Sequence, residues 1–256
     1  MRILLTNDDG IFAEGLYELA AALRKAGHEL FIGAPAENQS CISHALTLRK
    51  PLYADKTVIK GLEGITAYSI TGTPSDCVRL SLGNLGAEPD VIISGINHAP
   101  NLGTDAVYSG TVSAAIEGYM VDIPSIAVSK DTFEVDHMGD AAKFFADILP
   151  ELMRFFENGS AMLSVNIPST DISEYRGVRV ARLALQSYPL AFDERTDEDG
   201  RTAYTVRSNK LTVCGEDDFS DERYMREGYV VITPLTYDIT DSAGFDRAAK
   251  LFERDA

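Results

Sequence analysis

The sequence has few of the features that mark secreted, membrane-spanning or disulfide-rich proteins. Its 256 residues include no Trp and only three cysteines, Cys41, Cys77 and Cys214, which form no CxxC pair. An odd, scattered set predicts reduced thiols. No segment approaches the roughly 20 apolar residues of a membrane span, and the opening MRILLTNDDG resembles neither a signal peptide nor a transit peptide. We therefore expect a cytoplasmic protein without a membrane partner.

Basic residues are also scarce. Lys and Arg number 23 against 39 Asp and Glu, which gives a formal net charge of −16 and a pI near 4.6. No basic stripe interrupts this acidity, which disfavours electrostatic binding of a nucleic-acid polymer. The 45% hydrophobic and 24% charged residues are otherwise typical of a globular chain.

The first 130 residues alternate apolar runs with helical patterns, which predicts a parallel sheet with crossover helices. Helices are expected over Gly10–Gly27, from Thr73-Pro74, over Thr111–Tyr119 and over Asp140–Phe156, the last kinked or split by Pro150. The expected strands are Arg2–Thr6, Glu29–Ala34, Thr57–Ile59, Thr66–Ile70, Val91–Ser94 and Ile123–Val128. The pattern favours an α/β fold with a doubly wound, mostly parallel, Rossmann-like core over residues 1–160.

Residues 161–256 show a mixed pattern that we expect to form a C-terminal extension, continuous with the core. Strands are predicted over Met162–Ile167, Val178–Leu185 and Tyr229–Leu235, followed by a short helix. Thr202–Arg207 and Leu211–Val213 predict a projecting β-hairpin that turns at Ser208-Asn209, between two acidic runs.

Two polar clusters follow predicted strands, where open α/β sheets bind their ligands. Asp8 and Asp9 come directly after the first strand, and adjacent carboxylates repel each other unless a cation lies between them. The alternative is that one Asp caps the following helix. Asn97 ends the segment Ser94–Asn97, where its amide oxygen suits a metal or belongs to a ligand-free turn.

A third cluster, Ser109-Gly110-Thr111, opens a predicted helix. Free backbone N–H groups, two hydroxyls and the positive end of the helix dipole suit a phosphate group, although Ser109 alone also reads as an ordinary N-cap. His44 and His98 lie in candidate site loops, where they either contact substrate or are solvated. Neither a GxSxG elbow nor a GxGxxG motif is present, which argues against serine-hydrolase and dinucleotide-binding functions.

Several blocks in the same order resemble one known family. They are ILLTNDDG (Ile3–Gly10), GTPSDCV (Gly72–Val78), SGIN (Ser94–Asn97), NLGTDAVYSGTVSAAIEG (Asn101–Gly118), SVNIP (Ser164–Pro168) and GYVVITPLTYDIT (Gly228–Thr240). Together they resemble the survival protein SurE family of metal-dependent 5′-nucleotidases, nearly end to end. The resemblance implies hydrolysis of nucleoside 5′-monophosphates by attack of water, with Asp8 and Asp9 as catalytic residues.

The resemblance also implies a ligand set. One divalent ion per subunit, Mg, Mn or similar, would be held by Asp8, Asp9, Ser40 and Asn97, and the phosphate would be surrounded by Asn101, Ser109, Gly110 and Thr111. Two residues depart from the family pattern: Cys41 follows Ser40, and Ala99 stands where glycine is common. The family implies a homodimer or homotetramer, which fits a hairpin whose edges need partners.

Two other functions compete with this expectation. A phospho-accepting receiver domain also pairs acids after its first strand, and Lys130 follows a late strand as in receivers. However, Asn97 stands where such a domain needs its phospho-acceptor Asp, and 256 residues exceed a lone receiver. The other alternative is an α/β protein that binds nucleotides without catalysis, which binding of AMP without phosphate release would identify.

Overall fold

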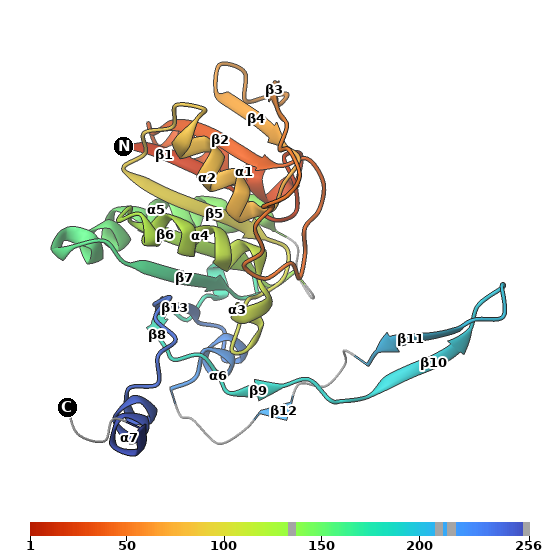
Figure 1. Ribbon diagram of the computed structural model, residues 1–256. Helices are drawn as coiled ribbons and strands as arrows, with labels where there is room; N and C mark the ends of the chain where they lie inside the picture. The colour runs from red at the N-terminus through yellow and green to blue at the C-terminus, as the bar shows by residue number, and fades with distance from the viewer. Residues whose placement is uncertain (133–136, 208–211, 214–218, 253–256) are drawn as a thin grey trace.

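The computed structural model describes residues 1–132, 137–207, 212–213 and 219–252. Its centre is a nine-stranded sheet, whose arrangement Figure 1 shows. The strand order is β3-β4-β2-β1-β5-β6-β7-β13-β8. Six neighbouring strands are parallel, namely β4 (Thr66–Ile70), β2 (Glu29–Pro35), β1 (Arg2–Thr6), β5 (Val91–Asn97), β6 (Ser125–Lys130) and β7 (Met162–Ile167). At the edges lie β3 (Ala54–Thr57), antiparallel to β4, β13 (Val230–Leu235), antiparallel to β7, and β8 (Val178–Val180), parallel to β13.

Helices cover both faces of the sheet, as the alternation along β1 requires. Ile3 and Leu5 pack with α1 (Glu14–Lys25) and α5 (Met138–Phe155). Leu4 points the other way and packs with Val78 of α2 (Pro74–Gly83) and Ala114 of α4 (Gly110–Met120). Successive residues of a strand face opposite sides, so the doubly wound prediction is confirmed.

Sequence signals near the helix ends predicted the helix boundaries well. Thr73 caps α2 by accepting from the Asp76 backbone N–H, the Asp76 side chain reciprocates, and Pro74 stands in the first turn, as a capping box requires. Pro150 lies inside α5, which continues through it as one helix from Met138 to Phe155; the expected split is wrong. Leu16, Leu19 and Leu23 form the buried face of α1, whereas Phe12 precedes the helix and is exposed.

Two strand predictions need correction at the sheet edges. The predicted strand Thr57–Ile59 is wrong except at Thr57, because β3 ends there and the chain turns back through Leu62, whose N–H donates to the Ile59 carbonyl. The predicted strand Val178–Leu185 pairs in the sheet only as far as Val180. Beyond it the chain leaves the sheet, and the Arg182 backbone pairs with residues 219 to 221 instead.

The extension carries a projecting hairpin, as expected, but its pairing differs from the prediction (Figure 1). β10 (Phe192–Thr196) pairs with β11 (Thr202–Val206), and the turn lies at Asp197–Arg201. At its root, β9 (Gln186–Ser187) pairs with β12 (Thr212–Val213), so the predicted partnership of residues 202–207 with 211–213 is wrong. The predicted turn residues Ser208-Asn209, and Leu211, lie outside the described residues.

The remaining elements are short and lie outside the main layers. They are α3 (Asp105–Tyr108), α6 (Asp221–Arg226), α7 (Ser242–Phe252) and the 3₁₀ turns Phe156–Asn158 and Ile172–Glu174. None of the residues in α7 is buried. Among the described residues, no helix combines the length and apolarity that crossing a bilayer requires.

Candidate active site

The adjacent carboxylates lie where β1 ends, in a turn closed by the buried side chain of Asn7. Its Nδ2 donates to the Gly10 carbonyl at 2.9 Å, and its Oδ1 accepts from the Gly10 N–H at 3.2 Å. The N-cap of α1 is Ala13, without any side-chain cap. Neither Asp8 nor Asp9 therefore caps this helix, which removes the structural alternative considered for the pair.

Asp8 is buried against the first turn of α4. The Thr111 hydroxyl donates to Asp8 Oδ1 at 2.6 Å, and only 3% of Asp8 is exposed. Burial raises the pKa of Asp8 to about 6, with the Thr111 hydrogen bond opposing the rise and the charge of Asp9 adding to it. A methyl group on Gly110 would lie 2.9 Å from Asp8 Cβ, so only glycine permits this close approach.

Asp9 has one carboxylate oxygen bonded and one free of donors. Asn38 Nδ2 donates to Asp9 Oδ1 at 3.2 Å, and Asn38 Oδ1 accepts from the Ser40 N–H at 2.9 Å. Asp9 Oδ2 is buried without a hydrogen-bond partner among the described residues. A buried anionic oxygen without a donor is costly, so this atom suits a cation. Asn38 thus joins Asp9 to Ser40.

Asn97 ends β5 at the same edge of the sheet. Its Nδ2 donates to the Ala99 carbonyl at 2.6 Å, so the amide oxygen is the atom that it can offer to a metal. Carboxylate, hydroxyl and amide oxygens are the ligands that hard divalent cations prefer. The donor set predicted for the metal therefore fits such an ion. No group of three or more His, Cys, Asp or Glu side chains that could hold a metal occurs in the described part of the chain, so a site here depends on neutral oxygens.

The predicted phosphate residues lie in two segments. Ser109 is the N-cap of α4, its Oγ accepting from the Val112 N–H at 3.1 Å. The N-cap interpretation is therefore correct, and Ser109 does not bond the N–H groups of Gly110 and Thr111. A hydrogen bond from the Thr111 backbone N–H lowers the pKa of Asp8. Asn101 is buried elsewhere on the edge, with its backbone N–H on Asn166 Oδ1 and its Nδ2 on Ser129 Oγ, both at 2.8 Å.

These hydrogen bonds and close approaches connect only some of the residues predicted for metal, catalysis and phosphate. Asp8 contacts Gly110 and Thr111, and Asp9 is joined to Ser40 through Asn38. Asn97 and Asn101 share the edge but bond within other segments. Asn38 was missed from the sequence, although an asparagine two residues before a candidate ligand is a usable signal for a side chain that bonds its own loop.

The two candidate histidines differ in their surroundings. His44 Nε2 lies 2.8 Å from Oε1 of Glu117, a side chain only 3% exposed, whose other oxygen accepts from Arg79 at 3.0 Å. His98 offers its carbonyl to the Thr132 hydroxyl. Lys130, considered above as a receiver-like lysine, is fully buried and donates to the backbone carbonyls of Asp131 and Pro168.

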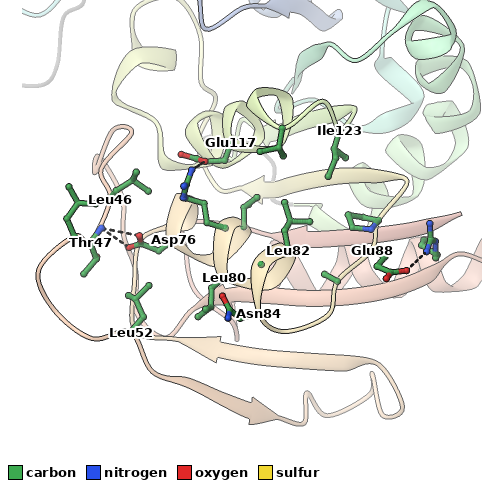
Figure 2. A pocket seen from close by; sticks show the side chains of 18 residues that line it. Leu46, Thr47, Leu52, Asp76, Leu80, Leu82, Asn84, Glu88, Glu117 and Ile123 are labelled. Carbon is green, nitrogen blue, oxygen red and sulfur yellow. Dashed lines mark hydrogen bonds and ion pairs between the residues drawn. The ribbon is translucent and has the colours of Figure 1, made fainter.

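One pocket lies away from the residues predicted for metal and phosphate. This open pocket has a volume of about 800 Å³ between α2, α4 and the segment Leu46–Leu52, and Figure 2 shows Asp76, Leu82 and Glu117 on its walls. None of the residues predicted for metal, phosphate or catalysis lines it. Chemistry rather than hollow size therefore identifies the candidate site.

A family model, curated relatives and a solved structure identify the same family for this chain. The family described as Survival protein SurE matches residues 3–189. The chain is 40% identical to the 5′-nucleotidase SurE of Alkaliphilus metalliredigens over 98% of both chains, and 43% identical to that of Desulfitobacterium hafniense over 94% and 93%. The crystal structure of the SurE protein from Aquifex aeolicus matches with a TM-score of 0.81 at 32% identity, covering 98% of this chain and 99% of that one. The chain therefore belongs to the survival protein SurE family.

Proposed function

We propose that this protein is a metal-dependent 5′-nucleotidase that hydrolyses nucleoside 5′-monophosphates to a nucleoside and phosphate. One observation carries the proposal: two adjacent carboxylates at the end of β1, one of them with a buried oxygen that has no hydrogen-bond donor in the described part of the chain. The names of the relatives from Alkaliphilus metalliredigens and Desulfitobacterium hafniense support the substrate class.

The residues that would hold one divalent ion are Asp8, Asp9, Ser40 and Asn97. When bound, such an ion lowers the pKa of a water molecule and polarises a phosphoryl oxygen. Thr111 orients the Asp8 carboxylate through its hydroxyl, and Asn38 keeps Ser40 beside Asp9. Mg²⁺ and Mn²⁺ both fit an all-oxygen donor set.

The first turn of α4 would receive the phosphate. The Gly110 N–H lies at the helix start, where the dipole favours an anion, whereas a hydrogen bond from the Thr111 backbone N–H lowers the pKa of Asp8. The helix start would stabilise negative charge as it develops on the phosphoryl oxygens. Asn101 would complete the set of residues around the phosphate. A carboxylate of the pair, Asp8 or Asp9, takes the proton that the attacking water gives up.

Phosphate release from AMP tests the proposal directly. The purified protein should release phosphate with Mn²⁺ or Mg²⁺ and stop when EDTA is added. Asp9→Asn should abolish turnover while circular dichroism and the urea midpoint stay near those of the wild type, because the substitution removes only charge at an oxygen that bonds nothing in the described residues. Turnover that continues in EDTA, or an Asp9→Asn enzyme with full activity, would contradict the proposal.

We also propose that the protein acts as a homodimer or homotetramer through the extension of residues 161–256. Every residue of α7 is at least partly exposed, including Phe245 at 62% and Phe252 at 84%. The hairpin likewise exposes Phe192 at 54% and Tyr204 at 63%. Apolar side chains gathered on projecting elements are typical of interaction surfaces. Light scattering at about micromolar concentration should give at least twice the mass of one chain, and a monomer would contradict this.

A further inference from the structure

The root of the projecting hairpin is bonded to the loop that precedes the proposed phosphate site. Thr104 Oγ1 donates to the Gln186 carbonyl at 2.6 Å and also accepts from the Gln186 N–H at 3.3 Å. Gly103 has φ +52°, and a methyl group there would lie 2.6 Å from the Ala184 carbonyl oxygen. Residues 184–186 of the extension are therefore held against the start of α3, and Figure 1 shows β9 running out from beneath α3.

Two tyrosines meet where these segments join. The Tyr188 hydroxyl donates to Asp105 Oδ1 at 2.5 Å. Its ring centroid lies 6.1 Å from that of Tyr108, with the planes inclined at 67°, an edge-to-face geometry. Tyr188 keeps 36% and Tyr108 keeps 48% of its surface exposed. Each ring is thus fixed in place and still presents apolar surface to the outside.

The tyrosine pair borders the candidate site on two sides. Tyr108 is followed directly by Ser109, the N-cap of α4, and its carbonyl accepts from the Ser43 N–H at 2.9 Å. In the same loop as Ser40, the Ser43 hydroxyl also donates to the Val107 carbonyl at 2.8 Å. The loop with the proposed metal ligand, the phosphate-binding turn and the extension therefore converge on these two rings.

We propose that Tyr108 and Tyr188 form an aromatic wall that binds the base of the nucleotide, so that the extension contributes to substrate recognition. The inference rests on the proposed nucleotide substrate and deepens it. A nucleotide whose phosphate lies at Gly110 and Thr111 needs a partner for its flat base, and aromatic side chains stack on every base because each has a π-face. The wall therefore favours nucleotides over sugar phosphates while it tolerates different bases.

The test compares AMP with ribose 5-phosphate, which has the same phosphate and sugar but no base. In Tyr188→Ala and Tyr108→Ala, the ratio of kcat/KM for AMP to that for ribose 5-phosphate should fall about tenfold. Tyr188→Phe keeps the ring and should lower the ratio less than Tyr188→Ala. Tyr237→Ala is the matched control with an unchanged ratio, because Tyr237 is half-exposed, packs edge-to-face on Tyr119, and follows β13 at the edge of the sheet where β7 begins.

The outcomes separate this inference from the proposed function. An equal loss for both substrates would mean that the tyrosines act only on structure, and an unchanged ratio would mean that they do not contact the base; either result overturns the inference. If the wild type hydrolyses neither substrate, the proposed function fails. Calorimetric binding of AMP and ribose 5-phosphate to the same variants, with Mn²⁺ and at matched protein concentrations, then decides the inference by the same ratio.

Discussion

Gly110 tests how closely α4 must approach Asp8. A methyl group at this position would lie 2.9 Å from Asp8 Cβ, 3.0 Å from Asp8 Oδ2 and 3.2 Å from Ile42 Cγ2. Ordinary carbon contacts begin near 3.5 Å, so Gly110→Ala must move the helix start or the carboxylate by about half an ångström. The backbone of Gly110 lies outside the left-handed region, so the contact alone opposes the change.

The expected loss falls mainly on activity. A displacement of about 1 Å in a reactive geometry costs about 100-fold, so half of that displacement should lower kcat/KM for AMP about tenfold. In stability, a helical Gly→Ala change gains up to about 1 kcal/mol, while overpacking costs about 1–3 kcal/mol. We therefore expect a decrease of about 1 kcal/mol in the free energy of unfolding.

Gly83→Ala is the matched control for this change. Gly83 is the last residue of α2, and a methyl group there would meet no atom within 4 Å. Phosphate release and urea denaturation are measured on both variants and the wild type. The Gly83 variant should keep full activity. Wild-type kcat/KM in the Gly110 variant, or an equal loss in both variants, would refute the argument from close approach.

Three further predictions concern buried hydrogen bonds. Thr111→Val removes a donor that lowers the pKa of Asp8, so in the metal-free protein an NMR titration of the Asp8 carboxyl should give a still higher pKa than in the wild type, and an unchanged or lower pKa would contradict this. Asp221→Ala leaves the N–H groups of Gly103 and Ala184 without their buried acceptor and should lower the free energy of unfolding by about 3 kcal/mol in urea; an unchanged urea midpoint would contradict this. At Glu117, hydrogen bonds from His44 and Arg79 outweigh burial and lower the pKa, so the stability that they supply is present at neutral pH and is lost as pH falls below the usual range of a glutamate. Glu117→Gln should therefore flatten the acid side of the stability profile, and equal slopes in variant and wild type would refute it.

The core was predictable because its signals are local. The buried runs of β1 and β5, the capping box at Thr73 and the apolar stripe of α5 each act over a few residues, within the range that periodicity detects. The hairpin was assigned to the wrong partner strand for the same reason. β10 is exposed at every residue and carries Asp193 and Glu194, so it has no buried face to produce alternation, and most of its residues fall in one of the two acidic runs that flank the predicted hairpin.

The candidate site was predictable in part. Asp8, Asp9 and the turn Ser109–Thr111 stand directly after or before regular elements, and their types carry their chemistry. Ser40 came only from the family resemblance, because it lies in a loop without a period. Asn38 contacts a residue 29 positions away, and Asp221 accepts from Gly103 across 118 positions. Such pairs form only after the sheet brings distant loops together, so no local sequence pattern predicts them.

The acidity of the chain is distributed in a way that permits an anionic substrate. Residues 1–130, which hold the candidate site, contain 9 basic and 14 acidic residues, whereas residues 131–256 contain 14 and 25. A phosphate at the start of α4, as proposed, would meet the Gly110 N–H and the positive end of the helix dipole, neither of which depends on a basic side chain. Beyond about 8–10 Å at physiological salt, the surface charge is largely screened, so it opposes a small nucleotide little. A nucleic-acid polymer would have to cross much more of the acidic surface, and we expect phosphate release from AMP to be inhibited weakly, if at all, by added single-stranded DNA.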